Sequence, residues 1–177
     1  MLARRVFLLS LLLVSLLAPA AIGAQLDFPK PKGWVNDFAK VLDDRVRERI
    51  KATCVEVDQK TSAQIAVVTI DTTEGTPIGD YTRLLFNEWG IGHKEDNRGM
   101  LVLLSIQDHT YYISVGRGFE TLFPNDRVYK IGAEMIPDLR KRRYGKAVLH
   151  AVNKIANIIA ADRGVALTST ARSTSSK

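Results

Sequence analysis

The apolar residues of this chain occur in continuous runs and in periodic stripes. Continuous runs over residues 64–70 and 100–106 predict strands buried on both faces, because each has the length of a strand and few polar positions. A second β-rich segment, 111–115, follows a short turn at 107–110. A turn this short joins antiparallel neighbours, so the last two strands are expected to pair antiparallel.

Stripes with spacings of three and four residues predict helices. Asp43 is the expected N-cap of the first helix, and Pro137 is expected to mark the end of the third. The helices are expected from Asp43 to the segment 59–63, and over residues 80–89, 125–135 and 144–161.

The order of these elements predicts an α/β fold in a single domain. Strand 64–70, helix 80–89 and strand 100–106 form a β-α-β unit, whose strands are expected to be parallel and whose crossover is expected to be right-handed. The antiparallel strand at 111–115 then makes the sheet mixed.

Residues 1–24 have the pattern of a secretory signal peptide. Arg4 and Arg5 precede an apolar stretch over 6–17, and small residues follow as far as Ala24. The apolar stretch is short for a membrane span, although an uncleaved anchor is the alternative. We therefore expect an exported protein, in the periplasm or outside the cell, that is soluble after cleavage.

The remaining chain is expected to hold one core and no internal disulfide. Residues 25–32 predict an extended lead-in, 33–164 the domain itself, and 165–177 a disordered Ser/Thr-rich tail. The one cysteine, Cys54, falls in an apolar stripe, so we expect a small buried side chain there.

Basic residues exceed acidic ones, and the excess is uneven along the chain. The net charge is +6, and it falls to +4 when residues 1–24 are removed, because they hold two arginines and no acid. The segment 140–146, R-K-R-R-Y-G-K, could bind phosphate groups or an anionic membrane surface, or could simply be solvated. Export and the lack of interleaved aromatic residues argue against nucleic acid as a partner.

The best-marked catalytic motifs are absent, and the remaining candidates are oxygen atoms in loops. Asp96 and Asn97 precede the strand at 100–106, and Glu120 follows the strand at 111–115. The antiparallel pairing brings these positions to one edge of the sheet. Together with Asp37, such oxygens suit calcium or magnesium. The alternative is that Asp37 and Asn97 cap turns and that Glu120 is solvated or paired.

Two glycine-containing motifs, W-G-I-G at 89–92 and G-R-G-F-E at 116–120, lie on either side of the strand pair. With W-V-N-D-F-A-K-V-L at 34–42, Q-I-A-V-V-T at 64–69 and N-R-G-M-L-V at 97–102, they resemble a TPM domain. That family is named after a thylakoid-lumen phosphatase, a photosystem II repair factor and a modulator of acetylcholine receptors. The resemblance covers residues 33–161.

The resemblance implies a three-layer α/β/α sandwich around a mixed, mainly four-stranded sheet. It also implies a metal-binding loop cluster in some members, matched here by Asp37, Asn97 and Glu120. Similar sequences often have Asp where this chain has Asn97, so one charge is missing. Acid phosphatase activity is ascribed to part of the family, and other members act in assembly or repair of membrane complexes.

Two hypotheses follow. The favoured one is a divalent-cation-binding module that helps to assemble or maintain an envelope membrane protein complex. The alternative is a metal-dependent acid phosphatase acting on a phosphate-bearing small molecule. In that case Arg117 would steady the anion, and Asp96 would serve as nucleophile or general base.

Overall fold

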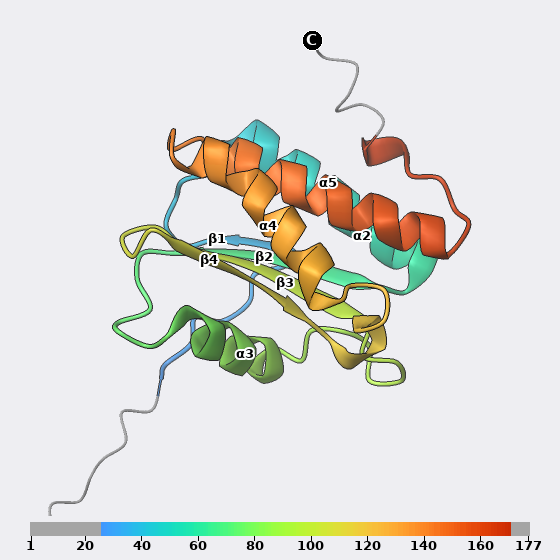
Figure 1. The fold of residues 1–177 in the computed structure, drawn as a ribbon, viewed down its shortest axis with the longest axis horizontal. Helices are drawn as coiled ribbons and strands as arrows, with labels where there is room; N and C mark the ends of the chain where they lie inside the picture. Colours follow the sequence, from blue (N-terminus) through green and yellow to red (C-terminus); the bar gives the residue numbers. More distant parts are fainter. Residues whose placement is uncertain (1–25, 171–177) are drawn as a thin grey trace, which may run out of the picture.

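The computed structural model describes residues 26–170, so the expected signal peptide lies outside the described residues. These residues form a four-stranded sheet in the order β1-β2-β3-β4 (Figure 1). The first three strands are parallel and β4 is antiparallel to β3. The strands are β1 (Val35–Asp37), β2 (Gln64–Ile70), β3 (Gly99–Ser105) and β4 (Thr110–Val115). The helices are α2 (Asp44–Thr61), α3 (Ile78–Glu88), the short η1 (Arg117–Phe119), α4 (Asn125–Leu139) and α5 (Tyr144–Asp162).

Helices α2, α4 and α5 cover one face of the sheet and α3 covers the other (Figure 1). Successive side chains of a strand point to opposite faces of the sheet, so alternate residues pack into the two cores. Ile65 and Val67 belong to the larger core beneath α2, α4 and α5. Ala66 and Val68 belong to the smaller core beneath α3. The predicted α/β sandwich with a mixed sheet is confirmed. Within residues 26–170, no helix is long and apolar enough to cross a membrane.

Two elements differ from the prediction. Residues around Val35 were expected to form a loop, but they make the edge strand β1, which pairs parallel with β2 from Val35↔Val67 to Asp37↔Thr69. Helix α4 was expected to end before Pro137, yet it continues to Leu139. The helix survives because the proline removes only one backbone donor, and the Arg140 N–H still donates to the Ile136 carbonyl at 2.9 Å.

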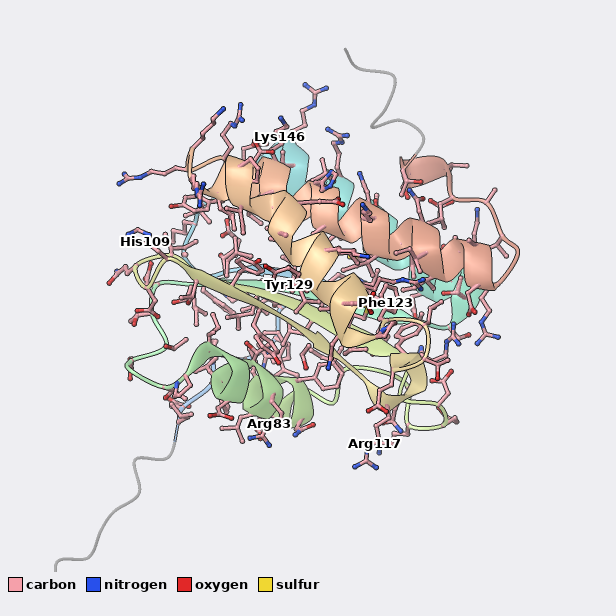
Figure 2. All side chains as sticks on the ribbon, viewed as in Figure 1. Arg83, His109, Arg117, Phe123, Tyr129 and Lys146 are labelled. Atoms are coloured by element: carbon pink, nitrogen blue, oxygen red, sulfur yellow. The ribbon has the colours of Figure 1, made fainter. Side chains whose placement is uncertain are left out.

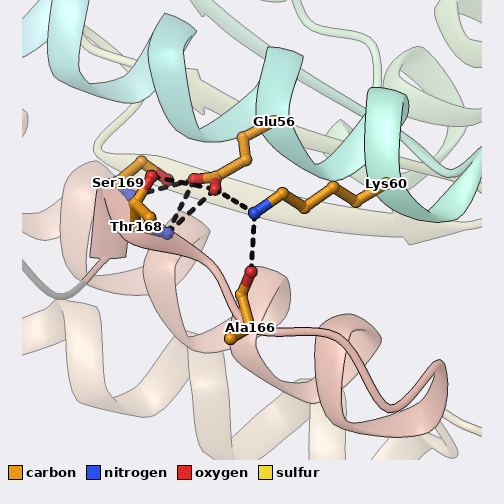
Figure 3. Close-up of polar contacts among 5 residues, drawn as sticks. All are labelled: Glu56, Lys60, Ala166, Thr168 and Ser169. Carbon is orange, nitrogen blue, oxygen red and sulfur yellow. Dashed lines mark hydrogen bonds and ion pairs between the residues drawn. The ribbon is translucent and has the colours of Figure 1, made fainter.

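Residues 165–170, which the sequence assigns to a disordered tail, are held against α2 (Figure 3). The carboxylate of Glu56 accepts hydrogen bonds from the backbone N–H groups of Thr168 and Ser169, each at 2.8 Å at its nearest. Lys60 donates to the same carboxylate and to a carbonyl of the segment. Burial alone would raise the pKa of Glu56, but the hydrogen bonds from Lys60, Ser169 and Thr168 lower it well below its usual value. The rest of the predicted tail lies outside the described residues.

Candidate functional site

A groove of about 1230 Å³ runs along β4, between α3 and α4. Strand β4 is an edge of the sheet, and its sequence, T-Y-Y-I-S-V, has neither charged residues nor proline. In Figure 2, Phe123 and Tyr129 lie on the α4 side of this strand and Arg83 lies on the α3 side. Tyr129 is 75% exposed and Tyr112 is 43% exposed. The groove therefore combines a long strand edge with accessible aromatic side chains.

The backbone of β4 offers hydrogen-bonding groups to the groove. At the end of the strand pair, the Gly116 N–H donates to the Gly99 carbonyl at 2.8 Å. In an antiparallel ladder, backbone groups alternate between the partner strand and the open side. Every second residue before Gly116 therefore also faces β3, and the residues between them face the groove. The residues whose N–H and C=O groups face the groove are Tyr111, Ile113 and Val115.

Each wall of the groove contacts β4 through a glycine. A Cβ atom on Gly132 of α4 would lie 2.6 Å from Cε2 of Tyr111. A Cβ atom on Gly79 of α3 would lie 3.2 Å from Cε2 of Tyr112. Neighbouring strand residues point to opposite faces of a sheet, so each tyrosine packs against one wall. These ring–glycine contacts set the distance of each helix from the strand.

The two walls differ in polarity. Phe123 and Val128 belong to, or pack against, the core beneath α4, so this wall is mainly apolar. The opposite wall carries Asp80, Arg83 and Asn87. Arg83 forms an ion pair with Asp80 at 3.1 Å. An extended chain in the groove would therefore meet apolar contacts on one side and polar contacts on the other.

Two glycines after β4 pack closely against the loop before β3. A Cβ atom on Gly116 would lie 2.3 Å from the Asn97 carbonyl oxygen, and one on Gly118 would lie 2.1 Å from the Asp96 carbonyl oxygen. Only glycine allows backbones to approach this closely. The motif G-R-G-F-E is thus explained as the place where the loop before β3 packs on the end of β4.

Side-chain contacts with two helices also fix the loop before β3. Arg98 forms an ion pair with Asp162 of α5 at 2.9 Å, and its guanidinium lies 4.6 Å from the ring centroid of Phe119. His93 Nε2 lies 2.9 Å from Asp58 Oδ1 of α2. This hydrogen bond raises the pKa of His93. The loop is therefore tied to two helices.

Three of the predicted site residues share the groove. Asn97, Arg117 and Glu120 all line it, which follows from the antiparallel pairing of β3 and β4. Asn97 has a left-handed backbone, with φ of 52°. The Asp96 carboxylate accepts a hydrogen bond from the Arg98 N–H at 3.1 Å and so caps its own turn.

Asp37 lies at the other end of the sheet. The register runs from Asp37 to Thr69 on β2 and from Thr69 to Leu104 on β3, whereas Asn97 precedes Gly99 at the start of β3. The five residue steps from Gly99 to Leu104 separate the two ends by about 16 Å. The sequence prediction that Asp37 joins the other oxygens is therefore corrected. It failed because the partner and direction of β1 were not predicted.

The oxygens of Asp37 already have partners. They accept hydrogen bonds from the N–H groups of Val41 at 3.1 Å and Leu42 at 3.0 Å, and from the Thr69 hydroxyl. Among residues 26–170, no three His, Cys, Asp or Glu side chains are grouped as metal ligands. Asn97 and Glu120 together supply one negative charge. The three predicted ligands thus do not fit a single cation.

Sequence reasoning missed the tyrosines of β4. The available signal was a strand without charge or proline at the end of the sheet, where edges are normally protected. No sequence signal identifies Gly79 and Gly132 as contacts, because they meet β4 only in the folded state.

Comparisons with known proteins agree with the fold. The family model of the TPM domain matches residues 35–158. No curated protein matches the chain.

Three solution structures are similar. The N-terminal domain of a P. gingivalis protein has 23% identity and a TM-score of 0.69, with 75% of this chain and 85% of that chain covered. The N-terminal domain of a Corynebacterium glutamicum protein has 13% identity and a TM-score of 0.59, with 75% and 84% covered. The BA42 protein of Bizionia argentinensis has 15% identity and a TM-score of 0.61, with 75% and 95% covered. At these identities the likeness concerns the fold alone.

Proposed function

Because the chain belongs to the TPM-domain family, we propose that it is an exported binding module that helps to assemble or maintain an envelope membrane protein complex. In this proposal the groove along β4 binds an extended segment of a partner protein, which adds to the sheet as a fifth strand. The observation that carries the proposal is the uncharged, six-residue edge of β4, open between two helices.

The main support is the backbone on the outer side of β4, whose N–H and C=O groups have no backbone partner among residues 26–170. A strand edge presents a row of N–H and C=O groups, and proteins normally protect such an edge with charge, proline, a bulge or a covering segment. Strand β4 has no charge and no proline, and α3 and α4 flank its open side within the described residues. A partner strand would pair with Tyr111, Ile113 and Val115.

The walls specify the side chains of the partner segment. Alternate residues of an added strand point to opposite faces of the sheet. Those directed to Phe123 and Val128 would be apolar, and those directed to Asp80, Arg83 and Asn87 would be polar. A segment of alternating apolar and polar residues fits both walls at once.

The test is site-specific photo-crosslinking in the cell envelope, followed by a measurement on the isolated pair. A photoreactive residue replaces Tyr112 in the groove. The matched control replaces Leu84, which is 41% exposed against 43% for Tyr112 but lies outside the groove. The crosslinked segment is then synthesised and added to the purified protein. We expect the backbone N–H groups of Ile113 and Val115 to exchange with solvent rapidly in the free protein and slowly with the peptide.

If the same partner crosslinks with equal yield to position 112 and to position 84, its contact with the protein lies outside the groove. Binding of the peptide without slower exchange at Ile113 and Val115 would exclude strand addition.

The phosphatase alternative rests on Asn97, Arg117 and Glu120, which line the groove together. The proposed nucleophile of this alternative is Asp96, and it is the weak point, because its carboxylate already accepts a hydrogen bond from the Arg98 N–H. The test is phosphate release from an aryl phosphate with calcium or magnesium present. Release that is lost in Arg117→Gln would favour the enzyme over the binding module.

A further inference from the structure

The corner between α4 and α5 is strongly basic. It contains Arg140, Lys141, Arg142, Arg143 and Lys146, all of them exposed, and these five residues are called the basic corner below. Arg143 and Lys146 form ion pairs with one carboxylate, Asp138, at 2.6 and 3.6 Å. Within residues 26–170, the other three form no ion pair. Figure 2 shows Lys146 at this corner, on the side of the molecule opposite Arg83 and Arg117.

The basic corner holds most of the net positive charge of the chain. Residues 138–146 hold five basic side chains and one acidic side chain, a net charge of +4, whereas the whole chain has +6. Arg4 and Arg5 hold the other two charges, so the remaining sequence is neutral overall. One corner thus gives this domain a positive pole.

The backbone of this corner is fixed by two hydrogen bonds. The Arg142 N–H donates to the Leu139 carbonyl and the Arg143 N–H to the Asp138 carbonyl, both at 2.9 Å. Arg142 has a left-handed conformation, with φ of 55°. The corner is therefore a tight turn between two helices, and it fixes the backbone from which the Arg140 and Arg142 side chains extend.

A second cavity, of about 480 Å³, opens beside these two arginines. Its lining includes the apolar side chains of Ile106, Ile136 and Leu139, together with Arg140 and Arg142. Two cationic groups next to an apolar hollow match an amphiphile with an anionic head and a hydrocarbon body. Inorganic phosphate would leave the apolar part of the cavity unused.

We propose that the basic corner binds anionic phospholipid at a membrane surface. Arg140 and Arg142 donate hydrogen bonds to the lipid phosphate, and the first carbons of an acyl chain occupy the cavity over Ile106, Ile136 and Leu139. The other basic side chains of the corner face neighbouring headgroups. This inference is independent of strand addition at β4, because it rests on different residues.

The experiment measures sedimentation with phospholipid vesicles. Residues 25–177, which include the whole described domain, are mixed with vesicles of phosphatidylcholine, with or without phosphatidylglycerol. Arg140→Gln/Arg142→Gln is compared with Lys51→Gln/Lys130→Gln, which removes the same charge from exposed side chains on α2 and α4. Each basic residue near an anionic surface contributes about 1 kcal/mol, so we expect the first pair to weaken binding about thirty-fold and the second to change it little.

Three outcomes would overturn the proposal. Absence of binding to phosphatidylglycerol vesicles excludes an anionic lipid surface. Equal weakening by both double variants means that net charge, not this corner, drives binding. The third outcome concerns competition between inorganic phosphate and the vesicles. If phosphate binds the protein as tightly as the vesicles do and displaces them at the concentration at which it binds, the arginines bind free phosphate instead.

Discussion

The two edges of the sheet are built in opposite ways. Strand β1 has three residues, and Asn36 at its centre is only 1% exposed. The Asn36 side chain accepts from the Lys32 N–H at 2.6 Å and donates to the Gly33 carbonyl at 2.8 Å. Strand β4 has six residues and faces a groove. The β1 edge is thus short and hydrogen-bonded to the segment that precedes it, whereas the β4 edge is long and accessible.

This difference leaves β4 as the accessible edge, which is what the proposed addition of a partner strand requires. A protein that protects one edge with a buried side chain could protect the other by a single lysine or proline. The sequence T-Y-Y-I-S-V contains neither. Two substitutions at or beside the β4 edge are expected to have the largest effects on stability, and the pH dependence of the loop before β3 is expected to have the smallest.

The end of the β4 edge depends on Gly116. In Gly116→Ala the new Cβ would lie 2.3 Å from the Asn97 carbonyl oxygen, so the backbone must move. We expect a loss of about 3 kcal/mol in the free energy of unfolding, measured by urea denaturation. Gly79→Ala, whose Cβ meets a tyrosine ring at 3.2 Å, is the control and should cost less than about 1 kcal/mol. Equal losses would contradict the close backbone approach.

Proline distinguishes the two sides of β4. By the alternation described above, the Ser114 N–H faces β3 and the Val115 N–H faces the groove. Ser114→Pro removes a ladder bond and leaves a carbonyl of β3 unpaired, so it should cost about 1–3 kcal/mol more than Val115→Pro. Urea denaturation of both variants measures the difference. No difference would mean that the outer side of β4 is already paired in the isolated protein.

The pH dependence of the loop before β3 should be the smallest effect. The hydrogen bond to Asp58 raises the pKa of His93 above its ordinary value of 6.5. The stabilisation is therefore fully present below about pH 6.5 and is lost as the pH rises through the raised pKa of the folded state. Because both side chains are partly exposed, we expect less than about 1 kcal/mol.

Unfolding midpoints of the wild type at pH 6 and pH 9 test this sign. The same comparison in Asp58→Asn should show a smaller change. An equal or larger change in that variant would assign the pH dependence to another group.

Much of the fold could be predicted from local patterns. The pattern of apolar residues alone identifies strands β2 and β3 and helices α2 and α5. Asp43 caps α2 as expected, and its side chain accepts a hydrogen bond from the Val46 N–H at 2.8 Å. Cys54 is fully buried, as its stripe predicts, and burial raises its pKa to about 12. Strand β1 was missed because V-N-D is short and polar, and its pairing with β2 is not local.

The position of a site residue could be predicted only where elements adjacent in the sequence also pack together. Asn97 and Glu120 were expected together because one hairpin joins their strands, and both line the groove. The position of Asp37 depends on which strand β1 pairs with and in which direction, and the sequence contains no signal for either. The groove itself arises from the packing of α3 and α4 on β4, which is a property of the folded molecule.

The contacts of Gly79 and Gly132 with the β4 tyrosines have a consequence for affinity. Because each helix meets the strand through its backbone and a rigid ring, the width of the groove is set before any ligand arrives. In the proposed complex the incoming segment would have to order itself, but the walls of the groove would have little conformational entropy left to lose. If the proposed partner segment binds here, selectivity should therefore depend on the shape and stiffness of that segment more than on rearrangement of the walls.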